Sequence, residues 1–452
     1  MQEKETLIND LTKGSVFKTL FMFSLPIMLA NALQAVYNLV DMAVVGQFNG
    51  AVGLSAVGIG GQIQNVFLCV GLGFANGAQV VISQQVGLKS DRISKSVGTL
   101  LTLEFLMGLV VGAFGVFGHN LILDLMNTPE AARSEAVSYM VICSCGMVFI
   151  FEYNALCAIL RGMGESKLPM VFIGCASVIN VVLDLFFVGV MNMGAGGAAL
   201  ATVIAQGVAC LCAIIYLYRH KEAANFDFKL HSFGLDKEQL MSLLRLGIPA
   251  MLQMMMIIAS VAFVNSRINL FDVTASAVDS IGGKLYTVVQ IVTQAIILSG
   301  ASMIAQNFSA GENERVKKVV RCSFMISMTW FVIMGAFYLF LPKQIFGIFT
   351  TDQSVLDMAP LYCKIAIINL LGSCTMTGQF SLVRGIGFAS FDLIVGILDG
   401  VVARIGLSML FGSIMGLSGY WFGTSLAGYV TTILTGIYYL SGRWEKRSSV
   451  TK

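Results

Sequence analysis

Apolar runs of about 20 residues or more recur along the whole chain, and they constrain its fold more than any other feature. As an α-helix that rises about 1.5 Å per residue, such a run crosses the roughly 30 Å of hydrocarbon in a bilayer. Only 12% of the residues are charged, about half the share found in soluble domains. We therefore predict an all-α integral membrane protein with twelve transmembrane helices, at 16–45, 53–85, 96–118, 135–160, 168–190, 196–218, 244–271, 277–307, 320–341, 356–383, 390–412 and 416–441.

The Lys and Arg residues indicate how these spans are oriented. With the amino terminus inside, only Arg133 and Lys343 fall in loops on the outer side, as positive-inside insertion requires. The polar start of the chain lacks the pattern of a signal peptide, so the first span is expected to be retained. We predict a multi-pass protein of the inner, cytoplasmic membrane with both termini in the cytoplasm.

Charge and cysteine content limit the partners of this chain. A formal net charge of +3 is too small to suggest a nucleic-acid partner, and the ten cysteines lie almost wholly inside the spans. None is left in the outer loops for a disulfide framework. We expect a monomer without a cofactor, whose partners are the bilayer and small molecules.

The chain contains an internal repeat. Pro26 recurs as Pro249, and "RGMG" at Arg161 recurs as "RGIG" at Arg384, both 223 residues later. Each repeat has six spans, so both enter the membrane in the same orientation and are expected to be related by a pseudo-two-fold axis along the membrane normal. We predict an amino-terminal lobe at 1–218, a cytoplasmic linker at 219–243 and a carboxyl-terminal lobe at 244–452. Such duplicated bundles are typical of transporters, with a static bundle or channel as the alternative.

A carboxylate, Asp41, lies within the first span on a polar helical face. Asn31, Gln34 and Asn38 precede it at spacings of 3, 4 and 3, which places all four on one side of the helix. An acidic side chain at the centre of a spanning helix costs about 2.5 to 3.5 kcal/mol, and such residues are usually functional. Pro26 in the same helix removes one backbone hydrogen bond and commonly causes a kink.

Further polar pairs occupy the spans of the first lobe. Asn180 and Asp184 are four apart in the fifth span, and Thr202 and Gln206 share a face in the sixth. Glu152 and Asn154 in the fourth span are two apart and diverge, so at most one can join a common site. Acids, amides and a hydroxyl together suit Na⁺ or a shared proton. The alternative is an acid kept neutral by neighbouring amides for packing.

The second lobe does not repeat these acids. Val264 stands at the counterpart of Asp41 and Leu407 at that of Asp184. We therefore expect the ion chemistry to be confined to the amino-terminal lobe. In the eleventh span Asp399 and Arg404 are five apart, which does not align them on an α-helix, so we expect each to find an ion-pair partner on another helix.

A wet substrate cavity between the lobes is predicted from further polar faces and from the flexible thioethers of "MLQMMMIIASVAF". For each polar residue, interhelical hydrogen bonding is an equal alternative. Met stripes more often belong to the core. The candidate cavity residues are Gln34, Asn38, Gln62, Asn65, Gln206, Met256, Lys284 and Gln290.

Two glycine-rich helix ends are candidates for turns and gates on the cytoplasmic side. Arg161 with Gly162, and Arg384 with Gly385, occupy equivalent places in the two repeats. We expect the arginines to make gate-closing contacts and the glycines to permit tight backbone geometry.

The chain resembles the multidrug and toxic compound extrusion (MATE) transporters over essentially its full length. The matching stretches are "LPIMLANALQAVYNLVDMAVVGQFNGAVGLSAVGIG", "GFANGAQVVISQQVG", "LRGMGESKLPM" and "GAGGAALATVIAQGV". The resemblance implies a cation site, for H⁺ or Na⁺, on Asp41, Asn180, Asp184 and Thr202, with Asn154 as an addition. Because the seventh and tenth spans carry no acid in their cores, the chain looks closer to the DinF-like branch than to the NorM-like branch.

The function implied by this resemblance is multidrug efflux by a cation-coupled antiporter, with a contribution to antibiotic resistance. One alternative is a lipid-linked sugar flippase of the same superfamily, although such proteins tend to have fourteen spans and a basic cavity. An intramembrane enzyme that uses Asp41 and Asp184 is a further alternative. Against the enzyme, the sequence has neither a G-x-G-D nor an H-E-x-x-H motif.

Overall fold

The structure is a computed structural model, and it describes residues 8–221, 226–229 and 232–450. Within these ranges every regular element is a helix. The first half contains α1 (Val16–Gly87), α2 (Ile93–Leu125), α3 (Glu130–Cys145), α4 (Met147–Gly162), α5 (Lys167–Asp184), the π-helix η1 (Leu185–Val190) and α6 (Gly194–Arg219). The second half contains α7 (Lys237–Ile268), α8 (Val273–Ser309), α9 (Asn313–Phe340), α10 (Pro342–Gly347), α11 (Gln353–Thr375), α12 (Thr377–Gly385), α13 (Ala389–Val395), the π-helix η3 (Gly396–Ala403), α14 (Arg404–Met415), α15 (Leu417–Leu440) and η4 (Arg443–Lys446).

These helices contain the twelve predicted spans. Nine helices of the described chain are long and apolar enough to cross a bilayer, and α3 with α4, bent by 49° at their junction, forms a tenth span. Helix α1 is broken at Gly50, where φ is 63° and ψ is −155°, so its 72 residues hold two spans instead of one. Helix α15, with 24 residues, is long enough for the remaining predicted span, although it is less apolar than the helices counted above. The prediction of an all-helical membrane protein is thus confirmed.

By packing, the chain divides into two compact units, and the division falls inside helices. The first unit consists of Met1–Asp10 and Leu25–Met251, and the second of Leu11–Ser24 and Leu252–Lys452. Helices α1 and α7 therefore each contribute residues to both units, with the changes close to Pro26 and Pro249. The predicted lobes, 1–218 and 244–452, differ from these units because the prediction placed each helix wholly in one lobe. Residues 222–225 and 230–231 of the predicted linker lie outside the described residues.

The start of the chain is held in the second unit by apolar packing and by hydrogen bonds. Leu11, Val16, Leu20 and Phe23 belong to a buried cluster with residues of α8, α9 and α12. The Leu11 N–H donates to Oε1 of Gln306 (2.9 Å), and Nδ2 of Asn307 donates to the Leu11 carbonyl (3.2 Å).

The start of α7 is held in the first unit in a similar way. Oε1 of Gln239 accepts hydrogen bonds from Nε2 of Gln85 (2.9 Å) and from Oγ of Ser96 (2.6 Å). All three side chains are buried. These polar groups satisfy one another where water is excluded.

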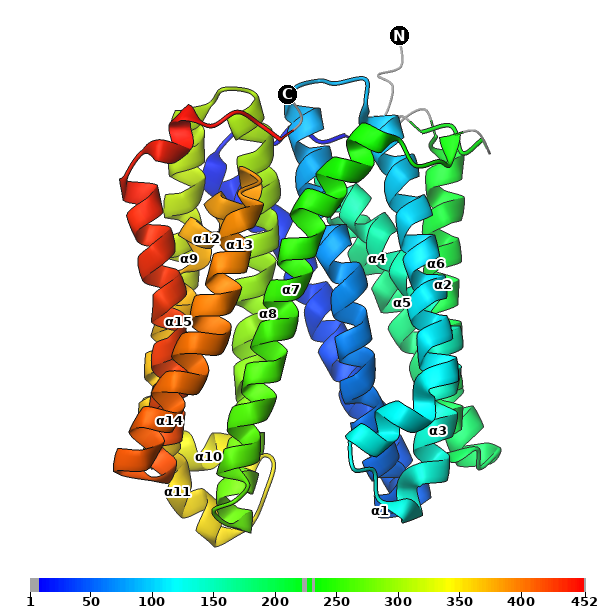
Figure 1. Cartoon of the computed structure of the whole chain (residues 1–452), viewed down its shortest axis with the longest axis vertical. Coiled ribbons are helices and arrows are strands. Elements are labelled where there is room, and N and C mark those ends of the chain that lie inside the picture. The colour runs from blue at the N-terminus through cyan, green and yellow to red at the C-terminus, as the bar shows by residue number, and fades with distance from the viewer. Residues whose placement is uncertain (1–7, 222–225, 230–231, 451–452) are drawn as a thin grey trace. The chain divides into compact units, whose positions relative to one another are not determined.

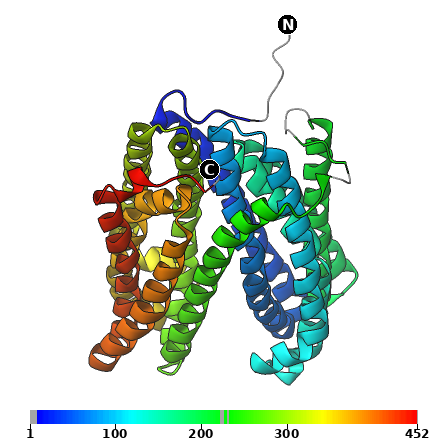
Figure 2. The same ribbon diagram turned by 45° about the horizontal axis from the view of Figure 1, so that its top comes forward.

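Each unit has its own apolar core. In the first unit, α2 approaches α4 closely because Gly108 has no side chain: a Cβ there would lie 2.9 Å from Cα of Val148. In the second unit, a core cluster includes Val289, Phe346 and Trp421, and α14 packs lengthwise against α15. Figure 1 shows this pair in orange and red, and the rotated view in Figure 2 keeps the two helices side by side.

Candidate ion-binding site

The structure brings Asp41 and Asp184 together in the first unit. Asp41 lies on α1 and is 5% exposed, and Asp184 is the last residue of α5 and is fully buried. Their two carboxyl groups lie close enough for each to interact with the other electrostatically. The chain enters the π-helix η1 directly after Asp184, and such wide turns often occur at functional sites.

An amide and a hydroxyl complete this cluster. Nδ2 of Asn180 lies 3.4 Å from Oγ1 of Thr202, to which it donates a weak hydrogen bond. Both side chains are buried and line a small pocket together with Tyr37 and Gln206. The four residues predicted as principal ion ligands therefore lie in one region of the first unit.

Four buried oxygen atoms in this region lack a hydrogen-bond partner among the described residues. They are Oδ1 of Asp41, Oδ1 of Asn180 and both carboxylate oxygens of Asp184. Burying a polar group without a partner costs free energy, and burying a charged one costs far more. A hard monovalent cation or a proton would satisfy these oxygens, because both are bound by oxygen atoms. The residues present thus fit either ion.

Tyr37 is a member of the cluster that the sequence analysis missed. Its hydroxyl interacts with the side chains of Gln34 and Gln206, and its ring is buried. The signal was present in the sequence, because Tyr37 precedes Asp41 by four residues and so shares its helical face. Tyr37 connects the predicted polar face of the first span to that of the sixth.

Asn154, the fifth predicted ligand, is half-buried on α4. Its Nδ2 donates to the carbonyl of Ile150 in its own helix (2.8 Å). The place of Asn154 among the ion ligands stays a prediction.

The predicted cavity residues differ widely in exposure. Gln206 is buried, Gln34, Met256 and Gln290 are half-buried, and four are exposed: Asn38, Gln62, Asn65 and Lys284. Two of them have specific neighbours within the second unit. The Lys284 ammonium lies 5.6 Å from the centre of the Phe349 ring, a cation–π contact. Oε1 of Gln290 accepts a hydrogen bond from Gln294 one turn later (3.1 Å).

The predicted gate residues lie at two helix ends, as expected. Helix α4 ends at Gly162 and α12 ends at Gly385. Nε of Arg161 donates to Oε1 of Gln79 (2.8 Å), and Nη2 of Arg384 donates to Oε1 of Gln253 (3.0 Å). Each arginine is thus anchored to a buried glutamine of its own unit.

The glycines at these ends have two separate functions in the structure. Gly162 and Gly385 are helical and allow close packing, since a Cβ at Gly385 would lie 2.7 Å from the Ala301 carbonyl oxygen. Two residues later, Gly164 and Gly387 adopt φ values of 86° and 74°. Only glycine adopts that conformation readily, and these two residues form the turns.

The expectation for Asp399 and Arg404 is wrong. Nη2 of Arg404 lies 3.0 Å from Oδ1 of Asp399, so the two residues pair with each other. The intervening segment is the π-helix η3, whose i to i+5 hydrogen bonding aligns residues five apart. The prediction assumed α-helical geometry throughout.

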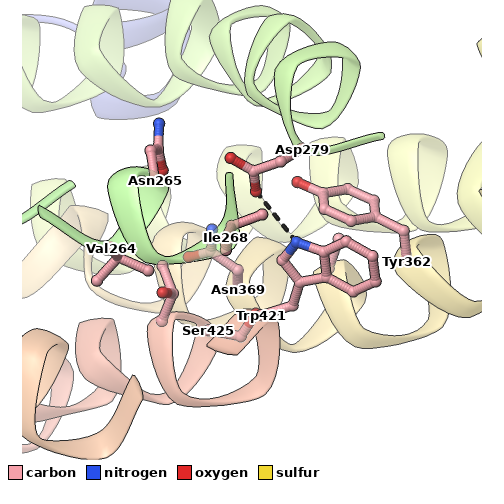
Figure 3. Close-up of a pocket in the computed structure, with 10 residues that line it drawn as sticks. Val264, Asn265, Ile268, Asp279, Tyr362, Asn369, Trp421 and Ser425 are labelled. Carbon is pink, nitrogen blue, oxygen red and sulfur yellow. Dashed lines mark hydrogen bonds between the residues drawn. The ribbon is translucent and has the colours of Figure 1, made fainter. Parts of the chain in front are cut away.

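The second unit contains a polar pocket that the repeat comparison did not predict (Figure 3). The pocket has a volume of about 60 Å³, room for a few waters. Val264 and Thr424, the counterparts of Asp41 and Thr202, both line it. The acid, however, is Asp279 from α8, whose Oδ1 accepts a hydrogen bond from Nε1 of Trp421 (3.1 Å). A comparison of equivalent positions could not find an acid that comes from a different helix.

Comparison with known proteins identifies the family. The sequence model of the MatE family matches residues 26–186 and again residues 249–410, once in each repeat. The chain belongs to the MATE family. Its two matched segments begin at Pro26 and at Pro249, the residues that first revealed the repeat.

Individual relatives cover nearly the whole chain. "Probable multidrug resistance protein YoeA" of Bacillus subtilis (strain 168) is 30% identical over 96% of both chains. "Multidrug export protein MepA" of Staphylococcus aureus (strain MRSA252) is 24% identical over 90% of both chains. A solved structure described as the outward-facing conformation of a multidrug resistance MATE family transporter of the MOP superfamily is 21% identical. It has a TM-score of 0.91 and covers 99% of this chain and 100% of its own, so this MATE protein has the two-lobe fold of that transporter.

Proposed function

We propose that this MATE protein is an antiporter of the cytoplasmic membrane that exports organic cations and amphipathic drugs in exchange for H⁺ or Na⁺. The observation that carries the proposal is the buried pair of Asp41 and Asp184, whose oxygen atoms include three without a hydrogen-bond donor among the described residues. The names of its relatives, a multidrug resistance protein and a multidrug export protein, support the substrate class.

In this proposal the ion acts through α1. That helix carries Asp41 in its part within the first unit, while its first turns, up to Ser24, belong to the second unit. Binding of one H⁺ or Na⁺ by the Asp41–Asp184 pair cancels one negative charge and gives the carboxylate oxygens a partner. The ion drives a change between two arrangements only by binding one of them more tightly than the other. Drug would leave in the ion-loaded arrangement and bind from the inside in the ion-free one.

Drug binding is assigned in this proposal to the polar and methionine side chains of the predicted cavity. Met256 offers an adaptable apolar surface, and Asn38, Gln62 and Asn65 offer exposed amides. Adaptable side chains of this kind suit substrates of varied shape more than one specific ligand.

The experiment that tests the proposal separates the two ions. Purified protein is reconstituted into proteoliposomes, and a pH gradient or a Na⁺ gradient is imposed alone while ethidium movement is followed. Antiport predicts that one of the gradients drives ethidium against its own concentration difference, and that dissipating the gradient stops the movement. Ethidium movement that is equally fast with no gradient would contradict coupling.

A further inference from the structure

A second buried acid of the first unit is not used by the proposed function. Glu104 lies on α2, within a membrane-spanning segment, and is fully buried. Both of its carboxylate oxygens lack a hydrogen-bond partner among the residues that the structure describes. An ionised carboxylate in that position would be left without compensation in the membrane interior.

A second acid lies close to Glu104. Glu152, on the neighbouring helix α4, interacts electrostatically with it. The two helices are packed closely at Gly108, which keeps the acids near each other. Glu152 is half-buried, whereas Glu104 is enclosed. On α6, Cys210 is the further titratable group that interacts with Glu152.

Two close neighbours of the Glu104 carboxyl are apolar. The carboxyl group faces Gly71 of α1: a Cβ added at Gly71 would lie 3.1 Å from Oε2 of Glu104. The same Cβ would lie 3.0 Å from the ring of Phe151. Gly71 therefore makes the room that the carboxyl occupies. Neither Gly71 nor Phe151 offers a side-chain oxygen.

This environment suits a proton better than a metal ion. Hard cations are held by about six oxygen ligands, and the two carboxyl groups provide at most four. A proton needs no cavity and only one oxygen. Two acids that repel each other in a medium of low polarity do not both ionise, so one of them keeps a proton.

We propose that Glu104 and Glu152 form a second proton-binding pair, distinct from Asp41 and Asp184. The pair holds one proton, and the half-buried Glu152 exchanges it with the surroundings. In each exchange a proton leaves one carboxylate oxygen for water and returns from water, and no other bond changes. This inference does not depend on the proposed transport function.

Infrared difference spectroscopy on the full chain in lipid tests the proposal, because the C=O stretch of a protonated carboxyl group is separate from that of a carboxylate. Wild-type protein is titrated from acid to alkaline pH and compared with Glu104→Gln and with Glu130→Gln, a control at an exposed acid. We expect Glu104→Gln to lose the signal of one protonated carboxyl that titrates reversibly, and Glu130→Gln to keep it. An unchanged signal in Glu104→Gln, or a signal that never responds to pH, overturns the proposal.

Two further variants show whether the lost signal comes from a folding defect of Glu104→Gln or from the Asp41–Asp184 pair. Glu152→Gln leaves Glu104 in place but removes the acid that repels it, so the pH at which the signal is lost must move, and an unmoved titration overturns the pairing of the two acids. Asp41→Asn combined with Asp184→Asn abolishes the first pair, and the Glu104-dependent signal must persist there. Its disappearance in that background would show that the proton belongs to the first pair and would overturn the proposal.

Discussion

The guanidinium of Arg404, the first residue of α14, lies 3.0 Å from the carboxylate of Asp399 in the preceding π-helix η3. Oδ2 of Asp399 also accepts a hydrogen bond from Oγ1 of Thr431 (2.6 Å), so both carboxylate oxygens are satisfied. The side chains of Asp399 and Arg404 are only 7% and 13% exposed. A buried ion pair of this kind stabilises a fold weakly, but breaking it from one side is costly.

Replacing Arg404 alone is therefore expected to destabilise the protein. Arg404→Met leaves Asp399 buried without its counter-ion, and we expect a loss of about 3 kcal/mol, typical when one partner of a buried pair is removed. Thermal unfolding in detergent measures it. The double variant Arg404→Met with Asp399→Leu should recover most of the loss, since no unpaired charge remains. Equal loss in the single and double variants would show that the pair itself is not the cause.

Gly385 and Gly406 offer a matched pair of helix glycines. A Cβ at Gly385 would lie 2.7 Å from the backbone oxygen of Ala301, whereas a Cβ at Gly406 would meet nothing within 4 Å. We expect Gly385→Ala to cost about 2 kcal/mol through overpacking. Gly406→Ala should instead stabilise the chain by about 0.5 kcal/mol, because alanine favours a helix more than glycine does. The thermal unfolding midpoint of each variant is compared with that of the wild type. Similar shifts in both variants would contradict the close packing of α12 on α8.

The start of α7 should respond to pH through Asp236, which lies outside the spans. Its carboxylate accepts hydrogen bonds from the N–H groups of Gln239 (3.1 Å) and Glu238 (3.2 Å), and Nζ of Lys95 lies 3.4 Å away. These contacts, the Gln239 hydrogen bond above all, hold the pKa of Asp236 below its ordinary value. The stabilisation is therefore complete above the ordinary pKa of an aspartate and is lost as the pH falls through the lowered one.

Hydrogen exchange over the first turn of α7 measures this contribution. At neutral pH, Asp236→Ala should weaken the protection of this turn by about 1 kcal/mol, the usual effect of losing an N-cap side chain. The difference between variant and wild type should shrink in acid. Asp236→Asn serves as the control, because asparagine caps a helix without a charge. A difference that stays constant with pH would exclude the titration of Asp236 as its source.

Helix length and repeat spacing were sufficient to predict the architecture. The twelve spans follow from the length of the apolar runs, and the presence of two units follows from the 223-residue repeat, whereas their limits inside α1 and α7 do not. The helical spacing of Asp41, Asn180, Asp184 and Thr202 placed each side chain on a polar face, and in the structure these faces lie in one region of the first unit.

Three features could not be read from spacing. The π-helix η3 changes which residues align, so Asp399 and Arg404 were separated by a rule that holds only for α-helices. Asp279 reaches its pocket from a helix without an equivalent acid in the first repeat. Glu104 stands alone in an apolar run, and its relation to Glu152 appears only when α2 packs on α4.

The central claim is that the Asp41–Asp184 pair couples ion binding to drug export. The most direct test measures ethidium export driven by an ion gradient in proteoliposomes that contain the Asp41→Asn variant. The control is Asp91→Asn, which changes an exposed acid in a loop. A single lost ion contact of about 1.4 kcal/mol changes an equilibrium tenfold. We therefore expect gradient-driven export to fall about tenfold or more in Asp41→Asn and to be unchanged in Asp91→Asn. Export by Asp41→Asn at the wild-type rate, with the same response to the gradient, would contradict the account.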